Sequence, residues 1–158
     1  MENIIDDVKA EFNRAKDRIT RDLTTTPDDK INWSPTESAR TPIQLVAHAA
    51  LGTTGITGML AGKPFPFSNM QEMDTASRQA EKEFTSREQV LAFLDKSSNE
   101  FLTWLDTLTA EQIASTLTLP FGPVPMASAI TFPADHLRCH AAQIEYVQTT
   151  YGDYSMHM

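Results

Sequence analysis

The apolar positions at the start of the chain recur at steps of three and four, which is the spacing of one face of a helix. From Glu2 to about Leu23 this face is made of Ile4, Ile5, Val8, Phe12, Ala15, Ile19 and Leu23. Charged side chains occupy the other face, as expected of a helix with one solvated side. The polar run from Thr24 to Asp29 then breaks the period. The pattern predicts one amphipathic helix at the beginning of the chain.

A second helix is predicted from Thr41-Pro42 to about Leu60. Threonine can cap the free N–H groups at a helix start, and proline is tolerated at the first helical position. The second half of this segment, Gly52-Thr-Thr-Gly-Ile-Thr-Gly58, is rich in glycine, which lowers helix propensity but allows another backbone or a ligand to come close. We expect close helix packing to be the main reason for these glycines. The loop Lys63-Pro-Phe-Pro-Phe67 ends the helix.

The next segments alternate between weak and strong helix signals. The polar stretch Asn69–Lys82 is predicted to be partly helical at most. The capping box Ser86-Arg-Glu-Gln89 begins a third helix, whose broad apolar stripe ends near Leu108. A short helical turn is expected at Thr109-Ala-Glu-Gln112.

The last third of the chain begins with a segment rich in proline and β-branched residues. This segment, Leu117-Thr-Leu-Pro-Phe-Gly-Pro-Val-Pro-Met126, predicts a loop or a small hairpin. A fourth long helix is expected from about Ser128 to Tyr151, with Pro133 either kinking it or lying in its first turn. Gly152 is expected to stop this helix.

Four long amphipathic segments with little strand signal predict an all-α fold, a four-helix bundle in which at least one long connection crosses over the end. A chain of 158 residues fits a single domain spanning 1–158. Trp33 and Trp104 are expected to anchor the core of this bundle.

Composition excludes several function classes and suggests a compartment. Thirteen Lys and Arg against twenty-one Asp and Glu give a net charge of -8, which disfavours binding to nucleic acid or to an anionic membrane. The longest apolar run, about Leu45–Leu60, is interrupted by His48, threonines and glycines, so no membrane span is predicted. The lone Cys139 cannot form an internal disulfide, and the N-terminus lacks the features of a signal peptide. These observations predict a soluble protein of the cytoplasm.

His136 and His140 are the most informative pair in the sequence. They lie four residues apart in the last predicted helix, so both imidazoles project from one face and can converge on one metal ion. His48 is the candidate third ligand, because it lies in an apolar stretch where a buried imidazole needs a partner. Three histidines leave a fourth tetrahedral position for water or substrate, which is typical of a catalytic zinc site. Zinc is the favoured metal, and nickel or ferrous iron also suits imidazole ligands.

Other residues near the pair allow alternative interpretations. Leu137 and Arg138 follow His136, so the general-base glutamate of a His-Glu-x-x-His peptidase is missing. Gln143 projects from the same face as the histidines. There it could support a metal ligand or bind substrate, or it could simply be a residue of the helix surface. Cys139 points to another side and is expected to fill the core rather than bind metal. An i, i+4 histidine pair can also be an ordinary surface or hydrogen-bonded pair.

Several motifs together resemble the DinB-like family. They are Trp33-Ser-Pro, Thr41-Pro-Ile-Gln-Leu-Val-Ala-His48, His136-x-x-x-His140-x-x-Gln143-Ile-x-Tyr146, and Tyr151-Gly152. The resemblance extends over nearly the whole chain in order. It implies a four-helix bundle with a long crossover, frequently a homodimer, and a metal held by residues corresponding to His48, His136 and His140.

The resemblance implies two classes of function. Some relatives are metal-dependent transferases or isomerases that use low-molecular-weight thiols, in which the metal activates the thiol. If the activity is shared, the partner is a small-molecule substrate or thiol, and we expect the electrophile to enter beside the glycine-rich second helix. The alternative is a non-catalytic, stress-associated bundle with a vestigial or binding-only site. No residue beyond the three histidines is identifiable as a catalytic acid or base, and Pro133 and the glycines depart from the expected pattern.

Overall fold

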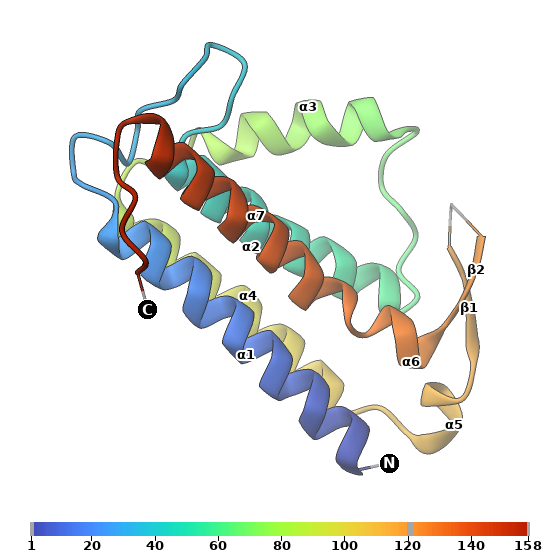
Figure 1. The fold of residues 1–158 in the computed structure, drawn as a ribbon. Helices are drawn as coiled ribbons and strands as arrows, with labels where there is room; N and C mark the ends of the chain where they lie inside the picture. The colour runs from blue at the N-terminus through green and yellow to red at the C-terminus, as the bar shows by residue number, and fades with distance from the viewer. Residues whose placement is uncertain (1, 120–121, 158) are drawn as a thin grey trace.

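The computed structural model describes residues 2–119 and 122–157. Its four long helices are α1 (Glu2–Thr25), α2 (Pro42–Leu60), α4 (Arg87–Leu105) and α7 (Phe132–Thr150). These helices pack side by side in a bundle, in which α1 contacts α7 and α4, and α2 contacts the same two helices (Figure 1). The prediction of an all-α four-helix bundle is therefore confirmed.

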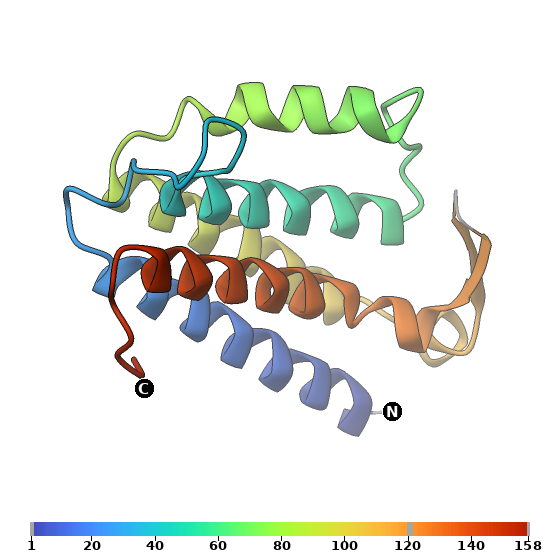
Figure 2. The ribbon, with the colours of Figure 1, turned by 45° about the horizontal axis from the view of Figure 1, so that its top comes forward.

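Two long connections give the bundle its topology. The first contains α3 (Met70–Glu81), which runs back along the outside of α2, so that α2 and α4 point in the same direction (Figure 2). The second lies at one end of the bundle, before α7 begins, and contains α5 (Ala110–Ile113), β1 (Thr116–Leu119), β2 (Gly122–Pro125) and α6 (Met126–Ala129) (Figure 1). A long crossover connection is therefore present, but α3 runs along the side of the bundle rather than over its end (Figure 2).

Local capping explains where the helices begin. Thr41 forms a reciprocal capping box with Gln44 at the start of α2, with Pro42 in the first turn as predicted. The Ser86 side chain accepts a hydrogen bond from the backbone N–H of Gln89 at the start of α4. Asn69 caps α3 in the same way, which makes the polar stretch after it a full helix of 12 residues rather than a partly helical one. These caps satisfy N–H groups that a helix leaves free at its first turn.

The structure corrects two predicted helix boundaries. Helix α4 ends at Leu105, three residues before the predicted end, and α5 (Ala110–Ile113) follows with Thr109 as its cap. The helix predicted from Ser128 is two helices, α6 (Met126–Ala129) and α7, with a break at residues 130–131. Pro133 lies in the first turn of α7, where its missing N–H costs no helical hydrogen bond.

The segment predicted as a loop or small hairpin is a hairpin. Strands β1 (Thr116–Leu119) and β2 (Gly122–Pro125) pair antiparallel, with Thr116 opposite Pro125. Positions 120 and 121 of the predicted segment lie outside the described residues. At the other end of the chain Gly152 has φ +92, the left-handed conformation that stops α7 as predicted.

All four long helices contribute side chains to one hydrophobic core. Phe12 and Phe101 are fully buried, with ring centroids 4.7 Å apart. Trp104 is partly buried and packs against this core, whereas the partly buried Trp33 meets Tyr151 edge to face. Cys139 is exposed, so the expectation that it fills the core is wrong.

Helix α2 explains the long apolar run of the sequence. Within the described residues it alone is long and apolar enough to cross a membrane by length and composition. Its buried side chains, however, lie between α4 and α7 inside the bundle. Its apolar character is that of a core helix.

Candidate metal centre

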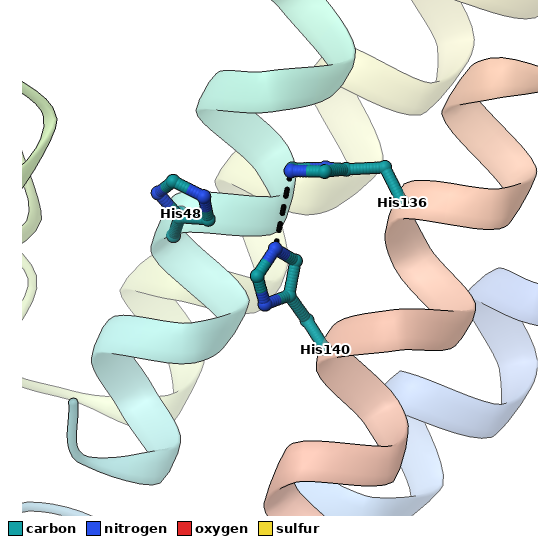
Figure 3. Close-up of side chains that lie close together, drawn as sticks. All are labelled: His48, His136 and His140. Atoms are coloured by element: carbon teal, nitrogen blue, oxygen red, sulfur yellow. Dashed lines mark hydrogen bonds between the residues drawn. The ribbon is translucent and has the colours of Figure 1, made fainter. Parts of the chain in front are cut away.

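Three histidines from two helices converge at one point between α2 and α7. His48 comes from α2, and His136 and His140 come from successive turns of α7 (Figure 3). The ring centroids lie 4.4–5.2 Å apart, and each ring offers a nitrogen within 4.8 Å of the others. The structure thus brings together the three residues that the sequence singled out.

The spacing of the α7 pair suits a shared metal ion. The Nε2 atoms of His136 and His140 lie 3.1 Å apart (Figure 3). Two imidazole nitrogens bound to one tetrahedral zinc at about 2.0–2.1 Å would lie roughly 3.3–3.4 Å apart. Only a small adjustment of the rings would therefore be needed to bind one ion.

Hydrogen bonds fix the orientation of two of the three rings. Nδ1 of His48 lies 2.8 Å from Oε1 of Glu81, and Nδ1 of His140 lies 2.7 Å from Oε1 of Gln143. Both oxygens accept hydrogen bonds, so each imidazole carries its proton on Nδ1. The Nε2 lone pair of His48 is then available for a metal ion, and that of His140 accepts a hydrogen bond from Nε2 of His136 at 3.1 Å, which a bound ion would replace. This arrangement, in which a second group fixes the tautomer of a ligand histidine, is usual at metal sites.

Burial keeps the α7 histidines neutral. Burial, aided by the neighbouring histidines and Arg40, lowers the pKa of His136 from 6.5 to about 3. Burial also lowers the pKa of His140, to about 4, although its hydrogen bond with Gln143 opposes this shift. Both rings are therefore deprotonated at neutral pH, which is the state that binds metal.

Glu81 is a buried carboxylate with a partner for each oxygen. Oε1 accepts from His48, and Oε2 accepts from Nε of Arg40 at 2.8 Å. Burial alone would raise the pKa of Glu81, but the hydrogen bonds from His48 and Arg40 lower it below its ordinary value. Glu81 thus stays ionised and adds a negative charge beside the histidines.

Gly52 makes room for the third ring. A Cβ atom at position 52 would lie 2.1 Å from Cε1 and 2.6 Å from Nδ1 of His136, far inside van der Waals contact. At least one glycine of the second helix therefore serves close packing, as expected, and its neighbour is a histidine of the cluster. Nδ1 of His136 is buried here and has no hydrogen-bond partner among the described residues.

A pocket of about 460 Å³ is lined by residues of α2, α3, α7 and the loop before α2, and by none of the three histidines. Gln143, which contacts His140, and Arg40, which contacts Glu81, both contribute to its wall. Leu45 and Val147 supply apolar surface, and the exposed Tyr146 lies at its edge. The pocket is large enough for part of a small organic molecule.

Sequence reasoning found the histidines and missed most of their supports. It placed Gln143 on the face of the histidines, and the structure shows it in contact with His140. Glu81 and Arg40 were not identified, because no local pattern links them to His48 or to each other. Cys139 is exposed and does not belong to the histidine cluster.

The donor set fits a divalent cation of the zinc class. Its nitrogens are closely spaced, and burial keeps both α7 rings neutral. Comparison with known families then identifies the fold, because the DinB superfamily matches residues 11–144. The chain belongs to the DinB superfamily. No curated protein matches the chain.

Solved structures share the fold at low sequence identity. YfiT from Bacillus subtilis, described as a probable metal-dependent hydrolase with an unusual four-helix bundle topology, has a TM-score of 0.75 and 16% identity, with 94% of this chain and 87% of YfiT covered. The sibling lethal factor precursor DfsB has a TM-score of 0.74 and 19% identity, over 94% of this chain and 97% of DfsB.

A longer protein also shares the fold. Mycothiol-dependent maleylpyruvate isomerase has a TM-score of 0.71 and 11% identity over 89% of this chain. The DinB superfamily chain spans only 60% of the length of that isomerase. At these identities the similarities show a common fold.

Proposed function

We propose that this DinB superfamily protein is a metal-dependent enzyme that acts on a small molecule, with His48, His136 and His140 as the metal ligands. The observation that carries the proposal is the pair of hydrogen bonds that Nδ1 of His48 and Nδ1 of His140 make with Glu81 and Gln143, because they leave Nε2 of each ring for an ion where the three histidine nitrogens lie within 4.8 Å of one another. A surface histidine pair has no need of such supports. Zinc is the preferred ion, with nickel or ferrous iron as alternatives.

Three protein ligands leave coordination open for a reactant. A divalent metal held there would lower the pKa of a bound water or thiol and so supply a nucleophile at neutral pH. Gln143 would hold the His140 ring in place, and Glu81 would do the same for His48. The neighbouring pocket would bind the organic part of the substrate through Leu45 and Val147.

A more specific proposal is that the enzyme uses a low-molecular-weight thiol. It is supported by the likeness to an isomerase described as mycothiol-dependent. A hydrolase reaction, in which water takes the place of the thiol, is supported in the same way by the likeness to YfiT. A location in the cytoplasm and a homodimeric state stay predictions, which fractionation and light scattering would check.

Metal analysis tests the proposal. The protein is purified without nickel chromatography, and its metal content is measured for the wild type, His140→Ala and His157→Ala. His157 is a matched control, because it contacts Asp153 near the C-terminus and lies outside the cluster. We expect about one divalent metal per chain in the wild type and the control, and loss of this metal in His140→Ala.

A wild-type protein that binds no metal, even after incubation with zinc, nickel or ferrous iron, would refute the proposal. That result would favour the non-catalytic interpretation with a vestigial site. If the metal is present, reactivity is then measured with thiols and electrophiles and, separately, with hydrolysable esters and amides. Turnover only when a thiol is present would favour the transferase class over the hydrolase class.

A further inference from the structure

Helix α3 is attached to the bundle in an unusual way. It runs along the outside of α2, with none of the four long helices on its other side (Figures 1 and 2). Of its 12 residues, all of which the structure describes, only Glu81 is buried. Apolar burial therefore contributes little to holding α3 in place, and its polar contacts must contribute most.

Those polar contacts form one continuous chain that ends at the candidate metal centre. Glu81, at the end of α3, contacts His48 and Arg40, each at 2.8 Å. Nη2 of Arg40 donates to Oδ1 of Asp74 at 2.9 Å, two turns earlier on α3. Asp74 also accepts from Nε of Arg78 at 2.9 Å, and Arg78 donates to the backbone oxygen of Ser38 at 3.2 Å. Arg40 thus contacts α3 at two points, Asp74 and Glu81, and Glu81 continues the chain to His48.

The contact between Glu81 and His48 should respond to the metal. Glu81 is 1% exposed, and a carboxylate at that depth is costly unless both of its oxygens are paired. A cation on Nε2 of His48 would withdraw electron density from the ring and make the Nδ1–H group a stronger donor. The bond to the charged acceptor Glu81 would strengthen, as charge-assisted hydrogen bonds do.

We propose that Glu81 is a positioning residue that orients His48 for the metal and, through the same carboxylate, couples metal binding to the docking of α3 against α2. The inference rests on the proposed function, because it requires that the histidines bind a metal. Coupling of this kind is reciprocal, so docking of α3 must raise metal affinity by the same factor by which the metal favours docking.

Glu81→Gln tests the positioning role, with Glu83→Gln as the matched control. Glutamine keeps the size of the side chain but removes the charge, and Glu83 is an exposed glutamate two residues further along the chain. Zinc affinity is measured by competition with a chromogenic chelator. We expect Glu81→Gln to bind zinc about 10- to 100-fold more weakly than the wild type, as is usual when a group behind a ligand is lost. The control should bind as tightly as the wild type.

Hydrogen exchange tests the coupling to α3. Amide exchange in residues 70–81 is compared with and without zinc, with α1 as an internal reference. In the wild type and in Glu83→Gln, zinc should slow exchange in α3 and leave α1 unchanged. In Glu81→Gln at saturating zinc, this protection of α3 should be lost.

Asp74→Asn provides a second variant that does not alter the buried carboxylate. The Asp74 side chain is 48% exposed and contacts Arg40 and Arg78 but none of the histidines, so this variant should fold even if Glu81→Gln does not. Loosening α3 in this way should still weaken zinc binding, by about fivefold, the lower end of usual coupling factors.

The outcomes separate this inference from the proposed function. A wild type that binds neither zinc, nickel nor ferrous iron means that the proposed function fails, and the inference fails with it. Tight zinc binding by both the wild type and Glu81→Gln overturns the positioning role alone. If zinc leaves exchange in α3 of the wild type unchanged, or if Asp74→Asn binds zinc as tightly as the wild type, the coupling is wrong.

Discussion

Gly52→Ala is the substitution whose effect can be worked out most directly from the structure. The added methyl group would lie 2.1 Å from Cε1 of His136, whereas ordinary van der Waals contact begins at about 3.4 Å. The imidazole must therefore move by about 1.3 Å. Metal–ligand distances tolerate deviations of only about 0.2 Å. We therefore expect zinc affinity to fall by about 10- to 100-fold, as it does when a group that orients a ligand is lost.

The effect of Gly52→Ala on stability is the sum of two opposing contributions. Alanine is favoured over glycine in a helix interior by about 0.8–1 kcal/mol. Overpacking at a buried site costs about 1–3 kcal/mol. The variant should therefore range from nearly unchanged to less stable by about 2 kcal/mol.

Gly55→Ala is the matched control on the same helix. Among the described residues, no atom beyond its own helix lies within 4 Å of a Cβ built at position 55. This variant should gain the helix contribution alone, about 0.8–1 kcal/mol, and should keep the zinc affinity of the wild type. Urea denaturation of the metal-free protein and zinc competition measure both quantities.

A double-mutant cycle isolates the clash with the histidine. In a His136→Ala background the ring is absent, so Gly52→Ala should become stabilising by about 0.8–1 kcal/mol. The interaction energy of the cycle should then be about 1–3 kcal/mol. If Gly52→Ala binds zinc like the wild type, or if its effect on stability is the same in both backgrounds, Gly52 does not determine the position of His136.

Two further predictions concern parts of the bundle away from the cluster. Burial, together with the nearby charge of Glu145, raises the pKa of Asp22 from 3.8 to about 6, so this group stabilises the fold fully below pH 3.8 and loses its contribution as pH rises through 6. The free energy of unfolding of Asp22→Asn minus that of the wild type should therefore rise by up to about 3 kcal/mol from about pH 4 to about pH 7.5. Urea denaturation at the two pH values measures this difference. The same difference at both pH values would contradict the raised pKa. Phe101→Ala removes a fully buried ring that packs on Phe12 and should reduce the free energy of unfolding by about 3–5 kcal/mol; a loss below 1 kcal/mol would show that this contact is not central to the core.

The features predicted correctly from the sequence depend on residues close together in the chain. The start of α2 is one example, since Thr41, Pro42 and Gln44 form the capping box by themselves. The pairing of His136 with His140 is another, because helical geometry alone places residues four apart on one face. The position of Gln143 follows from the same geometry.

The features that were missed depend on contacts between distant segments. Glu81 lies 33 residues from His48, and its own helix has few apolar positions, so no period marks it as buried. The exposure of Cys139 depends on which face of α7 meets α1 and α2, and the local pattern did not resolve this. The break before α7 also escaped prediction, because the proline that marks it is compatible with both a kink and a helix start.

Three departures from ordinary folding rules coincide at the histidine cluster. Gly52 lies inside a helix, at a cost of about 0.8–1 kcal/mol relative to alanine. Glu81 is a buried carboxylate, and Nδ1 of His136 is a buried polar atom without a described partner. Each departure reduces stability, and a bundle of this size could form its core without any of them.

Their coincidence at one point is best explained by selection for a site rather than for stability, because local inconsistencies in a natural fold concentrate where it functions. Replacing the cluster with apolar residues should therefore raise the stability of the metal-free protein. Replacement of a buried polar group by a hydrophobic residue of the same volume often increases stability. Metal binding would reverse this order, because a ligand that binds only the folded state adds its own free energy to stability. The wild type would then exceed such an apolar variant in stability only when zinc is present.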